Sequence, residues 1–143
     1  MSHPLLINPG VETRLIGVSK HLSQFKIDRF AVVSGGVGAL HVDPEYGKST
    51  IYRSTIAHGY LILGYICEML KNNFGRSWLI SGTMDVKLVG PARSGDTILT
   101  GGHIIEVKNE TERKNIVCNV WADNHVGDKI VVGQAEFTQE NCC

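Results

Sequence analysis

Residues 57–72 read AHGYLILGYICEMLKN. Apolar residues occupy almost every position between Leu61 and Leu70, and polar side chains gather near the two ends. A helix that is apolar around its whole circumference is normally a buried helix. We therefore predict a long buried helix here, which the rest of the chain must cover.

The sequence after this helix is typical of β-strands. Strands are predicted at 78–89, 97–107, 114–122 and 129–137, and hairpin-type turn sequences stand at 93–96 and 124–128. An antiparallel sheet that curves around one long apolar helix is the simplest arrangement of these elements. The sequence thus predicts an α+β fold of the hot-dog type, with the sheet wrapped around a central helix.

The segment before the long helix is rich in glycine. Ser23 has the residue type of an N-cap, and the apolar spacing after it predicts a short amphipathic helix over residues 23–33. The sequence GGVGA at 35–39 predicts a loop, because glycine is costly inside a helix. Asp43 followed by Pro44 is typical of the first turn of another helix.

Composition limits the function. The chain has 143 residues, and 14 Lys and Arg balance 14 Asp and Glu, which argues against an extended nucleic-acid surface. We expect one domain over residues 1–143, since no linker or repeat interrupts it. The apolar run at 59–67 is shorter than the roughly 20 residues that span a bilayer, and residues 1–10 do not resemble a signal peptide. We expect a cytoplasmic protein without membrane contact.

Cysteine and histidine spacing predicts no metal site, no cofactor and no disulfide framework. Of the four cysteines, no pair has the two-residue gap of a metal knuckle. The six histidines include no pair four residues apart, which is the spacing that places two imidazoles on one helical face.

The sequence FAVVSGGVGALHVDPE at 30–45, followed by IAHG at 56–59, resembles the signature of the MaoC-like family of (R)-specific enoyl-CoA hydratases and dehydratases. Similarity continues through PARSGDT at 91–97 and the hairpin at 124–135, so that it spans roughly 22–137. The resemblance implies a hot-dog fold and an acyl thioester substrate, carried by coenzyme A or an acyl carrier protein. It also implies a homodimer, or a heteromer with a related hot-dog subunit.

One departure from the family concerns its catalytic sequence, which usually reads Ser-Gly-Asp-x-Asn-Pro-Leu/Ile-His. Gly36 stands at the Asp position, Gly38 at the Asn position and Ala39 at the Pro position, whereas His41 is retained. In the family, Asp and His together activate the water that adds to C3. Loss of one positioned acid–base group typically lowers the rate about a hundred- to ten-thousand-fold. We expect the glycines to open space beside His41.

The resemblance makes His41 the catalytic acid–base residue. It also implies that the backbone N–H of Gly59 stabilises the developing oxyanion, at a helix N-terminus where free N–H groups and the helix dipole favour negative charge. The further substrate-binding candidates are Ser34, Gly36, Tyr52, Ile56, His58 and Cys67. For the apolar and aromatic residues among them, packing in the core is the alternative role.

Other charged residues are weaker candidates. Asp43, Glu45 or Glu68 could replace the missing carboxylate, although Asp43 fits better as a helix cap. Cations near the expected pocket mouth could meet the phosphates of a coenzyme A or carrier-protein arm. These cations are Lys48, Arg53 and Arg93.

Several functions are compatible with this pattern. The first is a hydratase or dehydratase that acts on an enoyl or 3-hydroxyacyl thioester. With a single acid–base side chain, double-bond isomerisation or a specialised lyase reaction is a second. A hot-dog thioesterase is a third, and a catalytically silent acyl-binding subunit of a hetero-oligomer is a fourth.

Overall fold

A computed structural model describes residue 6 and residues 9–141. The cysteines at 142 and 143 and most of the first ten residues lie outside this part of the chain. The elements, in chain order, are β1 (Ser19–His21), α1 (Gln24–Ser34), α2 (Ala39–Val42), α3 (Pro44–Ser49), α4 (Gly59–Phe74), α5 (Arg76–Ser81), β2 (Thr83–Leu88), β3 (Thr97–Asn109), β4 (Arg113–Asn124) and β5 (Lys129–Glu140).

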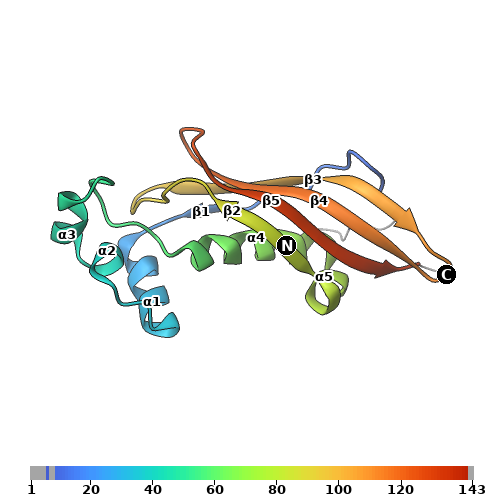
Figure 1. The fold of residues 1–143 in the computed structure, drawn as a ribbon, viewed down its shortest axis with the longest axis horizontal. Helices are drawn as coiled ribbons and strands as arrows, with labels where there is room; N and C mark the ends of the chain where they lie inside the picture. The colour runs from blue at the N-terminus through green and yellow to red at the C-terminus, as the bar shows by residue number, and fades with distance from the viewer. Residues whose placement is uncertain (1–5, 7–8, 142–143) are drawn as a thin grey trace.

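The strands form one antiparallel sheet in the order β1-β3-β4-β5-β2. Helix α4 lies along one face of this sheet, and α1, α2 and α3 gather beyond its N-terminal end (Figure 1). This is the predicted hot-dog fold, an α+β arrangement. No helix in the described part of the chain is both long enough and apolar enough to cross a membrane.

The core lies between α4 and the sheet. On the helix, Ile62, Ile66, Met69, Leu70 and Phe74 are buried. They pack in one cluster with buried side chains of the three long strands, which include Ile98, Ile104, Ile116, Val120, Ala135 and Phe137. Burial of a side chain of this size contributes roughly 1.5–3 kcal/mol relative to its exposure, so this face of α4 is the main source of stability.

The prediction that α4 is buried on all sides was wrong for this chain. Tyr60 is 79% exposed and Gly64 is exposed on the same helix. The sheet packs on one face of α4, and the described residues leave these positions on its other side exposed. The helix also begins two residues later than predicted, at Gly59.

The strand predicted at 78–89 was correct only over Thr83–Leu88, and the turn predicted at 93–96 forms, with the Asp96 N–H donating to the Arg93 carbonyl, but it does not join a hairpin. Residues 76–81 form α5, in which the ring of Trp78 packs edge-on against Phe137 at 6.3 Å. The true strand, β2, pairs with β5 instead of β3. The 93–96 segment is held elsewhere, because Gly95 N–H donates to the Leu22 carbonyl and Ser94 N–H donates to the Thr55 carbonyl.

Most other local predictions were confirmed. The Lys26 N–H donates to Ser23 Oγ at 3.3 Å, so Ser23 caps α1 as expected. The β4–β5 hairpin turns at 124–128, where Asn124 Oδ1 accepts the N–H groups of Val126 and Asp128. The glycine loop is shorter than predicted, because Ala39 already belongs to α2.

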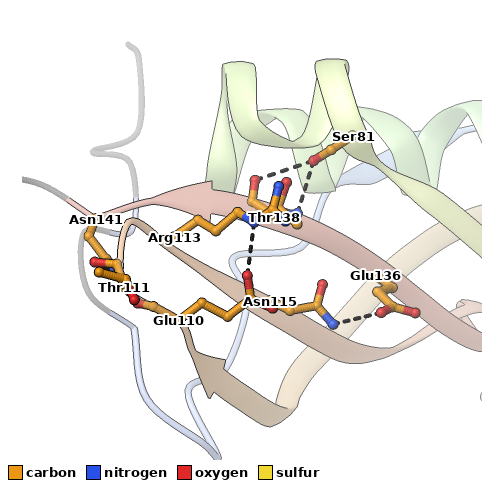
Figure 2. Close-up of polar contacts among 8 residues, drawn as sticks. All are labelled: Ser81, Glu110, Thr111, Arg113, Asn115, Glu136, Thr138 and Asn141. Atoms are coloured by element: carbon orange, nitrogen blue, oxygen red, sulfur yellow. Dashed lines mark hydrogen bonds and ion pairs between the residues drawn. The ribbon is translucent and has the colours of Figure 1, made fainter.

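Polar contacts hold the end of the sheet that lies away from α1, α2 and α3 (Figure 2). Ser81 Oγ accepts the Thr138 N–H at 2.9 Å, which ties α5 to β5. Across neighbouring strands, Asn115 Nδ2 donates to Glu136 Oε1 at 2.6 Å (Figure 2). These hydrogen bonds join α5, β4 and β5 at this end of the sheet.

The N-terminal end of α4 approaches β2 closely. A Cβ added to Gly59 would lie 2.6 Å from Leu88 Cδ1, which is shorter than any normal contact. A Cβ added to Gly64, one turn along the same helix, would meet nothing within 4 Å. A side chain at the first position would thus require the exposed Leu88 side chain to move, whereas one at the second position would not displace any atom.

We expect Ile66→Ala to lower the free energy of unfolding by about 2–5 kcal/mol, because Ile66 is fully buried and the truncation leaves a cavity. Urea denaturation followed by circular dichroism measures this change. Val126→Ala, at an exposed turn position, is the control and should stay within about 0.5 kcal/mol of the parent. Equal effects of the two substitutions would contradict the packing described here.

The two helix glycines should respond oppositely to alanine. Gly59→Ala should destabilise the protein by about 0.5 kcal/mol, because the exposed side chain of Leu88 has to move. Gly64→Ala should stabilise it by about 0.5–1 kcal/mol, since alanine favours an exposed helix interior. The same denaturation curves measure both, and a stabilising Gly59→Ala would rule out the close contact with Leu88.

Candidate active site

A cavity of about 470 Å³ opens where α4 begins. Its walls come from α2, the segment before α4, the end of β2 and the start of β5. Among these residues, His41 and Tyr52 are the ones whose side chains carry a nitrogen or oxygen atom. The wall residues are His41, Tyr52, Ile56, Ala57, Gly59, Ile62, Leu88, Val89, Gly90, Pro91, Ala92 and Ile130.

The His41 ring is held in a defined orientation. Its Nδ1 lies 2.8 Å from the carbonyl oxygen of Ile56. Because a carbonyl oxygen can only accept a hydrogen bond, Nδ1 carries the proton in the neutral ring, and the lone pair is on Nε2. Nε2 has no hydrogen-bond partner among the described residues, so it is the ring atom available to a substrate.

A second contact fixes the backbone of His41. Gln24, on α1, donates from Nε2 to the His41 carbonyl and to Asp28 Oδ1, both at 2.8 Å. The Thr55 hydroxyl donates to Gln24 Oε1. Sequence reasoning missed Gln24, since nothing local marks a residue 17 positions away as a partner of His41. This network ties α1, α2 and the segment before α4 together.

The Gly59 amide is the first of α4, with His58 at the N-cap. The first N–H groups of a helix have no carbonyl partner within the helix, and the helix dipole makes them attractive to negative charge. Gly59 and His41 line the same cavity. An imidazole and a helix-terminal N–H group thus line one cavity.

His58 lies behind His41 instead of in the cavity wall. The two imidazole rings stack with centroids 3.8 Å apart and an interplanar angle of 22°. His58 Nε2 is 2.6 Å from the Gly36 carbonyl oxygen, and so donates to it. A contact between His58 and the substrate stays a prediction. The His58 ring lies beside His41, the candidate catalytic residue.

The expectation that the two glycines open space beside His41 agrees with the structure at Gly38, where an added Cβ would meet only His41 Cδ2 at 3.9 Å, and not at Gly36. A Cβ added to Gly36 would lie 2.9 Å from both Cδ2 and Nε2 of His58 and 3.3 Å from Ser34 Oγ. The ring of His58 already fills the volume that a side chain at position 36 would enter. A side chain at position 36 would therefore require the His58 ring to move.

The alternative carboxylates are engaged elsewhere. Asp43 caps α3, with Oδ1 accepting the N–H groups of Glu45 and Tyr46, as the cap prediction required. Glu45 pairs with Lys48 at 3.0 Å. Within the described residues, no aspartate or glutamate lines the cavity.

Glu68, the third candidate, is on α4 and pairs with Lys20 at 2.9 Å. Among the candidate phosphate ligands, Arg93 is nearest the cavity, since its Nε donates to the carbonyl of the wall residue Tyr52 at 3.0 Å. Arg53 adjoins Tyr52 and has a left-handed backbone, with φ of 55°.

Of the other predicted site residues, Tyr52 and Ile56 line the cavity and two do not. Ser34 Oγ accepts the N–H of Gly36 at 3.3 Å and lies outside the wall. Cys67 is half-buried against the core, where burial raises the pKa of its thiol. Sequence reasoning missed Leu88, Val89 and Ile130 as wall residues, although the apolar residues before Gly90 were a usable signal.

Comparison with known proteins places these features in a family. Residues 10–126 match the family described as "MaoC like domain". An (R)-specific enoyl-CoA hydratase from Rhodospirillum rubrum is 30% identical over 87 residues, which cover 61% of this chain and 60% of that enzyme. The chain thus matches about three-fifths of the length of this relative.

Two further comparisons agree. A 3-hydroxybutyryl-CoA dehydratase from Methylorubrum extorquens is 23% identical over 115 residues, covering 80% of this chain and 71% of that enzyme. The crystal structure of a MaoC-like dehydratase from Rhodospirillum rubrum superposes with a TM-score of 0.83 at 15% identity and covers 99% of both chains, which shows the shared fold. Because the family match spans most of the sequence, the chain belongs to the MaoC-like dehydratase family.

Proposed function

We propose that this protein catalyses the reversible addition of water to a 2-enoyl thioester, with His41 as the acid–base residue and the Gly59 N–H as the oxyanion donor. The observation that carries the proposal is that both residues line one largely apolar cavity. The curated relatives are named as an enoyl-CoA hydratase and a 3-hydroxybutyryl-CoA dehydratase, which supports coenzyme A as the carrier.

The proposed hydration proceeds through an enolate. His41 Nε2 takes a proton from water as the water oxygen bonds to C3 and the C2–C3 π electrons move onto the thioester carbonyl. The Gly59 N–H stabilises the negative oxygen that results. The protonated His41 then delivers its proton to C2, which regenerates the thioester carbonyl. Dehydration is the same sequence in reverse.

Tyr52 has the remaining polar side chain in the wall. Its hydroxyl can accept and donate a hydrogen bond, so we assign it to hold the attacking water beside His41. Ile56, Ile62 and Ile130 supply an apolar surface for the acyl chain. Arg93, behind Tyr52, is the proposed contact for a phosphate of the carrier arm.

We also propose that the chain acts as a dimer, either of two copies or with a related hot-dog subunit. Large apolar side chains are exposed on α1 and at the start of α4, where they would be costly in an isolated molecule. They are Phe25, Val32, Val33 and Tyr60.

Double-bond isomerisation is the second candidate. It needs one base to move a proton between C2 and C4 of the acyl chain, and His41 is the one imidazole in the described wall, with no carboxylate beside it. Product analysis separates the two reactions, because hydration adds the mass of water to the substrate and isomerisation leaves the mass unchanged.

We expect His41→Ala to lower kcat for hydration of a four-carbon 2-enoyl-CoA by about a hundred- to ten-thousand-fold, because the acid–base group is removed. Loss of the conjugated thioester absorbance measures the rate. His103→Ala, on the sheet strand β3 and outside the cavity, is the matched histidine control and should retain parental activity.

Turnover of the parent that survives His41→Ala would contradict the proposed role of His41. Absence of turnover in the parent with short and medium 2-enoyl-CoA substrates would contradict the hydratase proposal and favour a silent acyl-binding subunit. Release of free coenzyme A, detected with a thiol reagent, would instead favour a thioesterase.

Tyr52→Phe should lower kcat about tenfold, which corresponds to the loss of one hydrogen bond worth about 1.4 kcal/mol in the transition state. Tyr46→Phe, on the exposed surface of α3, is the control and should leave kcat unchanged. If the two variants behave alike, Tyr52 serves only to shape the cavity.

A further inference from the structure

We infer that Gln24 is a positioning residue of this site: its side-chain amide joins the backbone of His41 to the segment that holds the His41 ring. The inference rests on the proposed acid–base role of His41. Gln24 lies outside the cavity wall, so the role assigned to it involves no contact with substrate. Its effect on the reaction passes through His41.

Helix α2, which carries His41, is not anchored by packing. It has four residues, none of which is buried, and the glycine-rich stretch 35–38 precedes it. A single helical turn is not stable by itself, because too few hydrogen bonds form within it. The position of the His41 backbone therefore depends on polar contacts with neighbouring segments.

Helix α1 supplies an anchor for α2. On α1, Ile27 and Ala31 are buried, and Ile27 belongs to the main core cluster. From the first turn of this helix, Gln24 Nε2 donates to the His41 carbonyl at 2.8 Å. Gln24 thus connects α2 to a helix that the core holds in place.

The same amide group also connects to the acceptor of the His41 ring. Gln24 Oε1 accepts a hydrogen bond from the hydroxyl of Thr55, which is 3% exposed. Thr55 directly precedes Ile56, whose carbonyl oxygen lies 2.8 Å from His41 Nδ1. The contacts form a closed ring, which runs from the His41 carbonyl through Gln24 and residues 55–56 back to the imidazole. Such support matters because small displacements of a base cost large factors in rate.

An amide satisfies both contacts at once. The His41 carbonyl needs an N–H donor, and the Thr55 hydroxyl donates to the amide oxygen. A glutamate of the same shape has no N–H group, and its carboxylate would also face the carboxylate of Asp28, to which Gln24 donates at 2.8 Å. A methionine of similar length offers neither a donor nor a strong acceptor.

Two readouts on the full chain test the inference. The first is kcat and KM for a four-carbon 2-enoyl-CoA. The second, independent of activity, is the tautomer of the neutral His41 ring, measured at alkaline pH by nitrogen nuclear magnetic resonance and assigned with His41→Ala. A ring whose Nδ1 donates to the Ile56 carbonyl carries its proton on Nδ1. The His58 ring, whose Nε2 donates to the Gly36 carbonyl, is the internal control.

We expect Gln24→Met to lower kcat about ten- to a hundredfold with KM within about twofold, because the His41 base moves relative to the substrate. The Nδ1–H tautomer of His41 should no longer predominate, while His58 keeps its proton on Nε2. Gln24→Glu should be at least as impaired, because it removes the donor. Gln134→Met, at an exposed position of β5, and Asp28→Ala, which removes the other acceptor of the Gln24 amide, are controls that should stay at parental values.

A double-substitution cycle tests the closed ring of contacts. Thr55→Val should lower kcat about tenfold, whereas Thr55→Ser keeps the hydroxyl and should stay within about twofold of the parent. Gln24→Met combined with Thr55→Val should be no more impaired than Gln24→Met alone, because both substitutions break the same ring of contacts. Losses that multiply would contradict the ring.

Three results would overturn the inference. They are parental kcat in Gln24→Met, a loss of kcat in Gln24→Met with an unchanged His41 tautomer, and a loss in Asp28→Ala as large as that in Gln24→Met. If the parent has no hydratase activity, the proposed function fails instead. The His41 tautomer in Gln24→Met then still decides whether Gln24 positions His41.

Discussion

One face of helix α4 is apolar along its whole length and has to be buried. The sheet packs against this face. Ile62, Ile66 and Leu70 recur at four-residue intervals, so a surface that covers them must run along the helix axis. Three long antiparallel strands provide such a surface. These are the three central strands of the sheet, and the shorter strands β1 and β2 form its two edges.

The site is where this packing ends. Ile62 and Ile130 belong to the core and also to the cavity wall, so the cavity continues the apolar interior toward the helix N-terminus. Its polar groups come from elsewhere, since α2 and the segment before α4 bring His41 and Tyr52 to the opening. In the proposed function, the acyl chain lies in the apolar part of this cavity while the thioester faces His41 and the Gly59 N–H.

The sequence predicts elements whose cause is local and misses those whose cause is distant. The α1 cap at Ser23 and the turn at Asn124 depend on neighbouring residues, and both are recognisable. The partner of β2 depends on where the 93–96 segment bonds, which no local pattern records. Trp78 is a residue type common in strands, yet it lies in α5, where its ring packs against the ring of Phe137.

The same distinction applies to the site. His41 and Gly59 stand in a recognisable local sequence, and the cavity contains both. The residues that support His41 cannot be recognised in this local sequence. Gln24 and His58 are distant from His41 in the chain and contact it only after folding.

The close approach of Gly59 to Leu88 links the start of the helix to the shape of the cavity. A smaller residue at 88 would lengthen the space for an acyl chain without altering the helix. A larger residue at 59 would instead require a compensating change at 88. The length of the cavity can therefore change through the strand position alone, whereas a change at the helix position is coupled to the side chain at 88.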